Sequence, residues 1–295
     1  MLTRSKPIRT GTGPPTSIPR PGRAAARGHN DRVSTPREVP AVTLPGGGRM
    51  PLIGFGTWKL RHDRARDAVL SALAVGYRHI DTATMYANEA EIGQALADSA
   101  VDRAHVFLTT KIRPTDAGKA RAIIRQSLKA LGTDYLDLWL VHWPPSRRGD
   151  SHQLWNELLE IQADGLARDV GVSNYSLTEI DDLARSSGHA PAVNQIDWGP
   201  TLYDERVLAG HAAHGIAVEG YSALKKTNLD DPALAKIAAA HGVTPAQVVL
   251  RWHLERNVTV IPKSAQPDRI AANFDILSFT LTPDEITSID ALAGG

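Results

Sequence analysis

Short apolar runs alternate with amphipathic stretches from residue 52 onward. The apolar runs stop near residues 57, 81, 111, 142, 172, 196, 220 and 261. Between them apolar residues recur at helical spacing, as over 63–75 before Gly76 and over 116–131 before Gly132, where a glycine suits a helix end. Regular strand–helix alternation with these eight strands predicts a parallel sheet closed into a (β/α)8 TIM barrel, with an open doubly wound sheet as the alternative. The 295 residues leave room for such a barrel, which needs about 250.

The pattern also predicts elements outside the strand–helix repeat. Residues 42–52 carry apolar positions on both sides of Gly46-Gly47-Gly48, which is typical of a small β-hairpin. Residues 283–293 add an extra helix after the last unit. Residues 1–38 are rich in Pro, Arg and Gly, so we expect a disordered extension there, with an organelle targeting segment as the alternative. Residues 39–295 are expected to form a single barrel domain.

Composition and charge narrow the classes of function. The net charge is +1, but seven of the 33 Lys and Arg residues and one of the 32 acids lie in residues 1–32. The remainder is mildly acidic, which argues against a nucleic-acid surface. Cysteine is absent, which excludes disulfides, thiolate catalysis and Cys-ligated metal sites. No apolar run approaches the ~18 residues of a membrane span, and we expect a cytoplasmic monomer that acts on a small molecule.

Four chemically active side chains follow apolar runs that have just stopped. Asp81, Lys111 and His142 each end a predicted strand, and Tyr86 follows shortly after the first of them. In a parallel barrel such strand ends emerge on one face, where active sites are built. Each residue has an ordinary alternative (a loop cap, a packed aromatic, an exposed lysine, a core histidine), but together they suit proton transfer. A phenol with a pKa of ~10 becomes a useful acid when a lysine stabilises its phenolate and a carboxylate fixes that lysine.

Motifs spread over most of residues 40–291 resemble the aldo-keto reductase family. They are Gly56-Thr57-Trp58, Ile80-Asp81-Thr82-Ala83 with Tyr86, Thr110-Lys111, His142-Trp143-Pro144, Gly171-Val172-Ser173-Asn174-Tyr175, Asn194-Gln195, and Ile261-Pro262-Lys263-Ser264 with Arg269 and Asn273. The short segments after His142 and Tyr221 are similar to the compact bacterial members, such as diketogluconate reductases. The G-x-G-x-x-G and P-loop nucleotide motifs are missing, so a nucleotide would be held by other means.

The resemblance implies roles for individual residues. Tyr86 would be the general acid, tuned by Lys111 and Asp81, and His142 would orient the carbonyl of the substrate. Around the nicotinamide ring of NADPH it implies Ser173, Asn174, Gln195 and Tyr221, and near the 2′-phosphate Lys263, Ser264 and Arg269. Further cofactor-binding residues would be Ser222, Leu224 and Asn273. Two cations and a hydroxyl beside a helix N-terminus suit a 2′-phosphate, which favours NADPH over NADH; a solvated basic face is the alternative. Gln266 and Ala272 depart from the usual family residues near the adenine.

Tryptophans are the candidate walls of the substrate pocket, because such pockets are largely apolar. The candidates are Trp58, Trp143 and Trp198, with Tyr203 as a further one; packing in the core is the alternative. Trp198-Gly199 departs from the His-containing turn common in the family. The leading interpretation is an NADPH-dependent reductase of small aldehydes and ketones. Two alternatives remain: an aldolase with Lys111 as a Schiff-base amine, and a non-catalytic NADPH-binding barrel that acts as a redox sensor.

Overall fold

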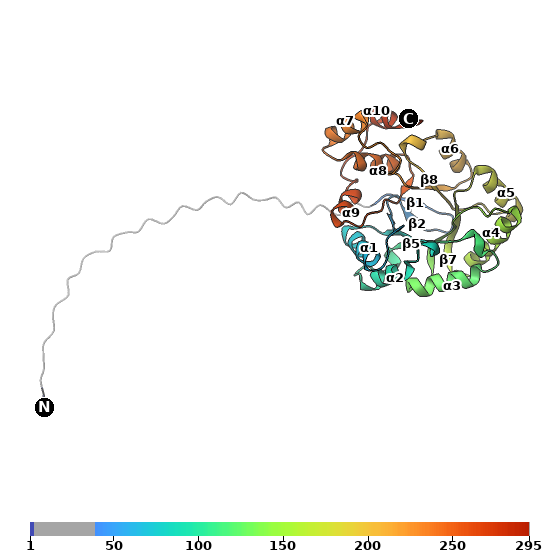
Figure 1. Ribbon diagram of the computed structural model, residues 1–295, viewed down its shortest axis with the longest axis horizontal. Helices are drawn as coiled ribbons and strands as arrows, with labels where there is room; N and C mark the ends of the chain where they lie inside the picture. Colours follow the sequence, from blue (N-terminus) through green and yellow to red (C-terminus); the bar gives the residue numbers. More distant parts are fainter. Residues whose placement is uncertain (3–38, 295) are drawn as a thin grey trace. The chain divides into compact units, whose positions relative to one another are not determined.

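A computed structural model describes residues 1–2 and 39–294, so the predicted extension over 1–38 falls almost entirely outside the described residues. The elements from Ala41 to Asp290 belong to one compact unit. Its centre is a parallel sheet whose strands follow one another in chain order (Figure 1). The strands are β3 (Phe55–Gly56), β4 (His79–Asp81), β5 (Phe107–Ile112), β6 (Leu136–Val141), β7 (Ala167–Ser173), β8 (Val193–Asp197), β9 (Ala217–Tyr221) and β10 (Thr259–Val260).

The first and last strands meet at a seam that closes the sheet. Ile53, just before β3, forms a parallel bridge with Val260 of β10. Gly54 N donates to Val260 O at 2.8 Å, and Val260 N donates to Leu52 O at 2.9 Å. A Cβ on Gly54 would lie 2.7 Å from His79 Nδ1, so this tight seam needs a glycine. The predicted (β/α)8 barrel is confirmed, and the open doubly wound alternative is excluded.

Helices surround the sheet at the positions that the amphipathic pattern predicts. They are α1 (Asp63–Val75), α2 (Glu89–Asp98), α3 (Ala120–Leu131), α4 (Arg148–Ala163), α5 (Leu177–Ser187), α6 (Glu205–Ala213), α7 (Pro232–His241), α8 (Pro245–Glu255), α9 (Pro267–Phe274) and α10 (Pro283–Asp290). Helix α3 begins four residues later than expected, because Gly118 has a φ of +82° and interrupts the helix after a short 3-10 turn at Pro114–Asp116. Capping boxes start α5, α8 and α10.

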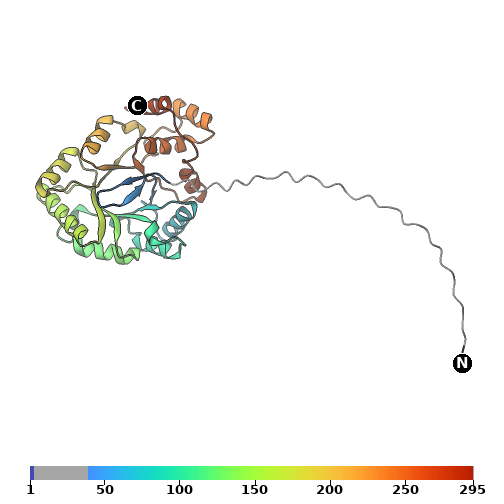
Figure 2. The same ribbon diagram turned by 180° about the vertical axis from the view of Figure 1, so that it is seen from behind.

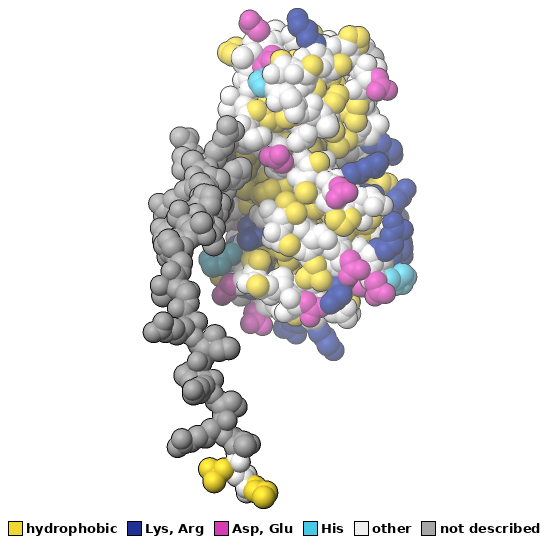
Figure 3. Space-filling model, turned by 90° about the vertical axis from the view of Figure 1, so that its left-hand side faces the viewer, with side chains coloured by type: hydrophobic (Ala, Val, Ile, Leu, Met, Phe, Trp, Pro, Cys, Tyr) yellow, Lys and Arg dark blue, Asp and Glu magenta, His cyan; other side chains and the backbone are white. Residues whose placement is uncertain are grey.

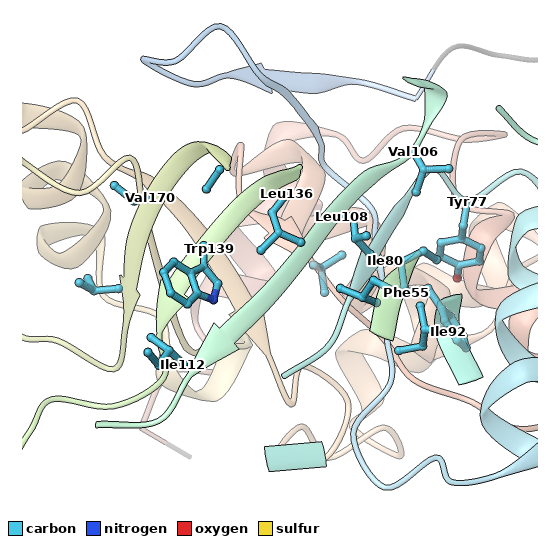
Figure 4. Packing of buried hydrophobic residues seen from close by; sticks show 14 of the residues in the cluster. Phe55, Tyr77, Ile80, Ile92, Val106, Leu108, Ile112, Leu136, Trp139 and Val170 are labelled. Carbon is cyan, nitrogen blue, oxygen red and sulfur yellow. The ribbon is translucent and has the colours of Figure 1, made fainter. Parts of the chain in front are cut away.

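The main core lies between the sheet and the surrounding helices. Apolar side chains of neighbouring strands, among them Ile80, Leu108 and Trp139, are fully buried there (Figure 4). Tyr77 packs edge-on against Phe55 with ring centroids 5.5 Å apart. These alternating strand positions point away from the barrel axis, and the positions between them point inward. Inward positions on β4, β5, β8 and β9 carry the polar residues described below.

A hairpin closes the N-terminal end of the barrel. It consists of β1 (Ala41–Thr43) and β2 (Arg49–Pro51) and lies inside the ring of helices, drawn in blue in Figure 2. Met50 is fully buried in a cluster with Phe107 and Val193, which start strands β5 and β8. Gly46 N in the hairpin turn donates to Asp169 Oδ1 at 2.7 Å. The opposite end, where the strands finish, is therefore the end that can open to a ligand.

The described surface carries charges of both signs. On the face drawn in Figure 3, acidic and basic side chains are interspersed with apolar ones. Among the described residues no single helix is long and apolar enough to cross a membrane. The helices α7 and α8 together have the required length and composition, but they are bent by 87° relative to one another.

Candidate active site

A lysine and an aspartate form the centre of the candidate site. Asp81 ends β4, and Lys111 lies one strand away, near the end of β5. Lys111 Nζ lies 2.7 Å from both carboxylate oxygens of Asp81 and 2.8 Å from Thr82 O. Lys111 has no exposed surface, and Asp81 is 2% exposed. The ammonium group therefore has an acceptor for each of its three protons.

The loop after β4 brings the phenol to this pair. Tyr86 ends the 3-10 turn η1 (Thr84–Tyr86), and Lys111 Nζ lies 5.2 Å from the centroid of its ring. The ring of His142, directly after β6, packs edge-on against it at 5.6 Å between centroids. Buried Asn88 fixes the loop, because its Nδ2 donates to Thr57 O at 3.0 Å and its Oδ1 accepts from Thr82 Oγ1 at 2.7 Å. The structure thus brings all four predicted catalytic residues together.

The surroundings of the site shift the pKa values of Lys111, Tyr86 and His142 and so determine which of them is charged. Burial lowers the pKa of Lys111, but the charge of Asp81, with further contributions from neighbouring groups, more than compensates and leaves it raised. Burial raises the pKa of Tyr86, and the charge of Lys111 opposes that rise. Burial, followed by the charge of Lys111, lowers the pKa of His142 to about 3. At neutral pH the site therefore holds an ammonium ion, a protonated phenol and a neutral imidazole.

Three residues predicted to surround the nicotinamide form a hydrogen-bonded chain at the strand ends. Tyr221 OH donates to Asn174 Oδ1 at 2.7 Å, and Asn174 Nδ2 donates to Ser173 Oγ at 2.9 Å. Ser173 Oγ in turn donates to the backbone oxygen of Gln195 at 2.9 Å. Asn174 adopts a φ of +64°, which asparagine tolerates better than most residues. Ser222 and Leu224 follow on the loop after β9, both half-buried.

Gln195 has a partner that the sequence analysis missed. Its Nε2 donates to Asp81 Oδ2 at 2.9 Å and to Glu219 Oε2 at 3.0 Å. Glu219 has no exposed surface, and burial, with a further contribution from the Asp81 charge, raises its pKa to about 8. The available signal was a glutamate in the middle of an otherwise apolar strand, at the position that β-sheet register places beside Gln195.

The cofactor residues predicted at the last strand–helix junction lie on two neighbouring segments: Lys263 and Ser264 between β10 and α9, and Arg269 and Asn273 on α9. Lys263 and Arg269 are exposed, and neither forms an ion pair with a described residue. Ser264 is buried, and its Oγ accepts from Gln266 N at 3.0 Å; Asn273 is half-buried on the last turn of α9. Two cations that have no ion-pair partner in the described part of the chain and lie beside a helix N-terminus suit a phosphate group.

The predicted pocket tryptophans divide into two groups. Trp58 and Trp143 are 48% and 47% exposed; Trp58 lies in the loop after β3, and Trp143 directly follows His142. Met85, which the sequence analysis missed, is 52% exposed beside Tyr86. Trp198 is 2% exposed and packs against Tyr203 in a second core cluster with Trp252, at 6.1 Å between the Trp198 and Tyr203 ring centroids. The placement of Trp198 agrees with the alternative interpretation, in which it packs in the core.

Comparison with known proteins settles the family. The model of the Aldo/keto reductase family matches residues 52–293. The chain belongs to the aldo-keto reductase family. An aldo-keto reductase of Mycolicibacterium vanbaalenii is 42% identical over 260 residues, which cover 87% of this chain and 93% of that protein. The methylglyoxal reductase DkgA of Escherichia coli K12 is 38% identical over 257 residues, covering 86% and 94%.

A solved aldo-keto reductase structure links the fold to its cofactor. A variant of the Gox0644 protein, crystallised in complex with NADPH, has a TM-score of 0.83 and 34% identity and covers 87% of this chain and 94% of its own. The expected oxidoreductase class and the NADP(H) cofactor are confirmed. This aldo-keto reductase also has residues that fit the group: Lys263 and Arg269, which have no ion-pair partner among the described residues, for a phosphate, and the amide of Gln195 for the carboxamide.

Proposed function

We propose that the chain reduces small aldehydes or ketones to alcohols with NADPH, and that Tyr86 is the general acid. The observation that carries this proposal is the contact of the Tyr86 ring with both Lys111 Nζ and the His142 ring, at 5.2 and 5.6 Å. A buried cation beside a phenol favours the phenolate that forms when the proton leaves. Small carbonyl compounds are proposed because the related DkgA is named for methylglyoxal.

The side chains then divide the work of proton transfer and orientation. When bound, NADPH would supply the hydride for the carbonyl carbon. Tyr86 donates its hydroxyl proton to the carbonyl oxygen, and the fixed charge of Lys111 stabilises the resulting phenolate. The neutral His142 ring hydrogen-bonds the same oxygen without competing as an acid, because its pKa is about 3. We assign the exposed rings of Trp58 and Trp143 to apolar contacts with the substrate.

The aldolase alternative conflicts with the state of Lys111. A Schiff base requires a neutral amine with a free lone pair, and a catalytic lysine has a lowered pKa. Lys111 instead has a raised pKa and donates to Asp81 and Thr82 from a fully buried position. The redox-sensor alternative leaves the contact between Tyr86, Lys111 and His142 without a purpose.

A substrate screen tests the proposal. Purified protein is mixed with NADPH and a panel of small aldehydes, ketones and keto-sugars, and the loss of NADPH absorbance is followed. We expect turnover of at least one class. Binding of NADPH without turnover of any carbonyl would favour the sensor instead. Reduction of a protein–substrate mixture with borohydride should leave Lys111 unlabelled, and labelling there would favour the aldolase.

A further inference from the structure

Glu219 is a fully buried carboxyl group to which the mechanism above gives no role. It lies on β9 directly beside Gln195 of β8 in the parallel register. Its Oε2 accepts a hydrogen bond from Gln195 Nε2 at 3.0 Å, and the same nitrogen donates to Asp81 Oδ2 at 2.9 Å. One amide group therefore joins Glu219 to the carboxylate that holds Lys111.

The two carboxyl groups determine which end of the Gln195 amide faces inward. An amide has a donating NH2 end and an accepting oxygen end, which have almost the same shape. Reversing the amide would place its oxygen against Asp81 Oδ2, a carboxylate oxygen that accepts from Lys111 and has no proton to donate. The NH2 end is therefore held inward, and among the described residues none donates to Gln195 Oε1.

The surroundings of Glu219 keep this arrangement across neutral pH. His79 Nε2 on β4 lies 3.5 Å from Glu219 Oε1, and burial lowers the pKa of His79 to about 3, so this ring is neutral. Thr259 on β10 pairs with Glu219 in register and is uncharged. Lys111 pairs with Asp81, and Glu219 holds a proton up to a pKa of about 8. Either form of the carboxyl group has an oxygen that accepts from Gln195.

We propose that Glu219 is a positioning residue for the cofactor: with Asp81 it fixes the Gln195 amide so that Oε1 accepts a hydrogen bond from the carboxamide NH2 of the nicotinamide. This inference rests on the proposed function, because it requires the nicotinamide ring to lie beside Gln195. Its chemistry is specific, since an acceptor distinguishes a carboxamide from a group that lacks N–H donors.

Two variants and two ligands test the position of the amide. Glu219→Leu removes the acceptor for Gln195 Nε2, whereas Glu219→Gln keeps a carbonyl oxygen there. We expect Glu219→Leu to bind NADPH about tenfold more weakly, the equivalent of one hydrogen bond, and Glu219→Gln to retain binding. Binding of 2′,5′-ADP, which lacks nicotinamide, should be unchanged in both. Equal losses for NADPH and 2′,5′-ADP, or no loss of NADPH in Glu219→Leu, would overturn the proposal.

A cofactor analogue without a carboxamide donor tests whether the oxygen of the Gln195 amide faces the nicotinamide. In the 3-acetylpyridine analogue of NADP⁺ a methyl ketone replaces the carboxamide and removes its donor. The wild type should bind NADP⁺ more tightly than the analogue, and Glu219→Leu should lose most of that preference. Thr259→Val changes the adjacent inward position without contacting Gln195, so it should keep the preference; the same loss there would overturn the proposal. A wild type that binds no NADPH would instead reject the proposed function.

Discussion

Lys111 donates to both carboxylate oxygens of Asp81, each at 2.7 Å, from a side chain with no exposed surface. The third proton of its ammonium group points to Thr82 O at 2.8 Å. A lysine held in this way is a fixed positive charge rather than a proton donor. Its charge can therefore act on Tyr86 by electrostatics, which supports the proposal that the phenol is the group that gives up a proton.

The first prediction concerns Tyr86→Phe. This substitution removes the hydroxyl and keeps the ring, so NADPH affinity should be retained while kcat for carbonyl reduction falls about 100- to 10,000-fold, the range of a lost general acid. NADPH fluorescence gives the affinity, and the absorbance assay gives kcat. Tyr203→Phe, in the second core cluster, is the control and should keep full activity. A fully active Tyr86→Phe enzyme would reject Tyr86 as the acid.

The second prediction concerns stability. Lys111→Met leaves the carboxylate of Asp81 buried without its cation, so we expect the free energy of unfolding to fall by about 3–5 kcal/mol. The double variant Lys111→Met with Asp81→Asn removes the uncompensated charge as well and should recover most of that loss. Urea denaturation measures both. If the two substitutions were simply additive, the pair would not be coupled as described.

The third prediction separates the two nicotinamide cofactors. Arg269→Ala should raise the Kd for NADPH about 10- to 100-fold and leave the Kd for NADH little changed, because only NADPH has the 2′-phosphate. Arg125→Ala, an exposed arginine on α3, is the matched control and should change neither value. Equal losses for the two cofactors in Arg269→Ala would remove the phosphate assignment.

The fourth prediction is the pH dependence of reduction. The reaction needs protonated Tyr86, and its raised pKa keeps that form at neutral pH. His142, with a pKa of about 3, is neutral throughout the same range. We therefore expect kcat/KM for reduction to stay level from about pH 5 to 7.5 and to fall only under alkaline conditions. An inflection near pH 6.5 that disappears in His142→Gln would contradict a neutral imidazole.

The fifth prediction is the pH dependence of stability. Burial lowers the pKa values of His79 and His142 to about 3 and of His253 to about 4, from an ordinary 6.5. The unfolded chain therefore binds more protons at these histidines below pH 6.5, and their contribution to stability increases as the pH rises toward 6.5. Glu219 acts in the opposite direction, because its pKa of about 8 lies above the ordinary 4.5. Its contribution decreases from pH 4.5 to about 8.

A maximum near pH 6.5 follows from these opposing slopes. Between pH 6.5 and 8 the Glu219 term should reduce the free energy of unfolding by ~2 kcal/mol. Glu219→Gln should remove this decline and make the rise between pH 4.5 and 6.5 steeper, as measured by urea denaturation across pH. A wild type whose stability stays level from pH 6.5 to 8 would contradict the raised pKa of Glu219.

Much of the fold and the site could be predicted from the sequence, because each barrel unit repeats the same signal. An apolar run that stops at a polar residue marks a strand end, and β4, β5 and β6 place Asp81, Lys111 and His142 as this rule requires. The helix that ends before Gly76 was also predicted to the residue, as α1. These features could be predicted because they depend on the local sequence of each strand or helix and not on contacts between distant strands.

Features that depend on contacts between distant strands could not be read from the chain. Glu219 resembles any strand glutamate until β8 and β9 bring it beside Gln195. Trp198 follows β8 as a pocket residue would, but a partly buried Tyr203 and the fully buried Trp252 draw it into the core. In both cases side-chain direction and neighbouring packing decided the role, and neither follows from residue type or spacing.

The barrel seam has a consequence for ligand-linked stability. Strands β3 and β10 are only two residues long, and the segment with Lys263 and Arg269 continues directly from β10. A dinucleotide bound there would stabilise the short contact between the β3 segment and β10 that closes the barrel. Amide protons at Gly54 and Val260 should therefore exchange faster than those at mid-barrel in the free enzyme, and slow most when NADPH is added.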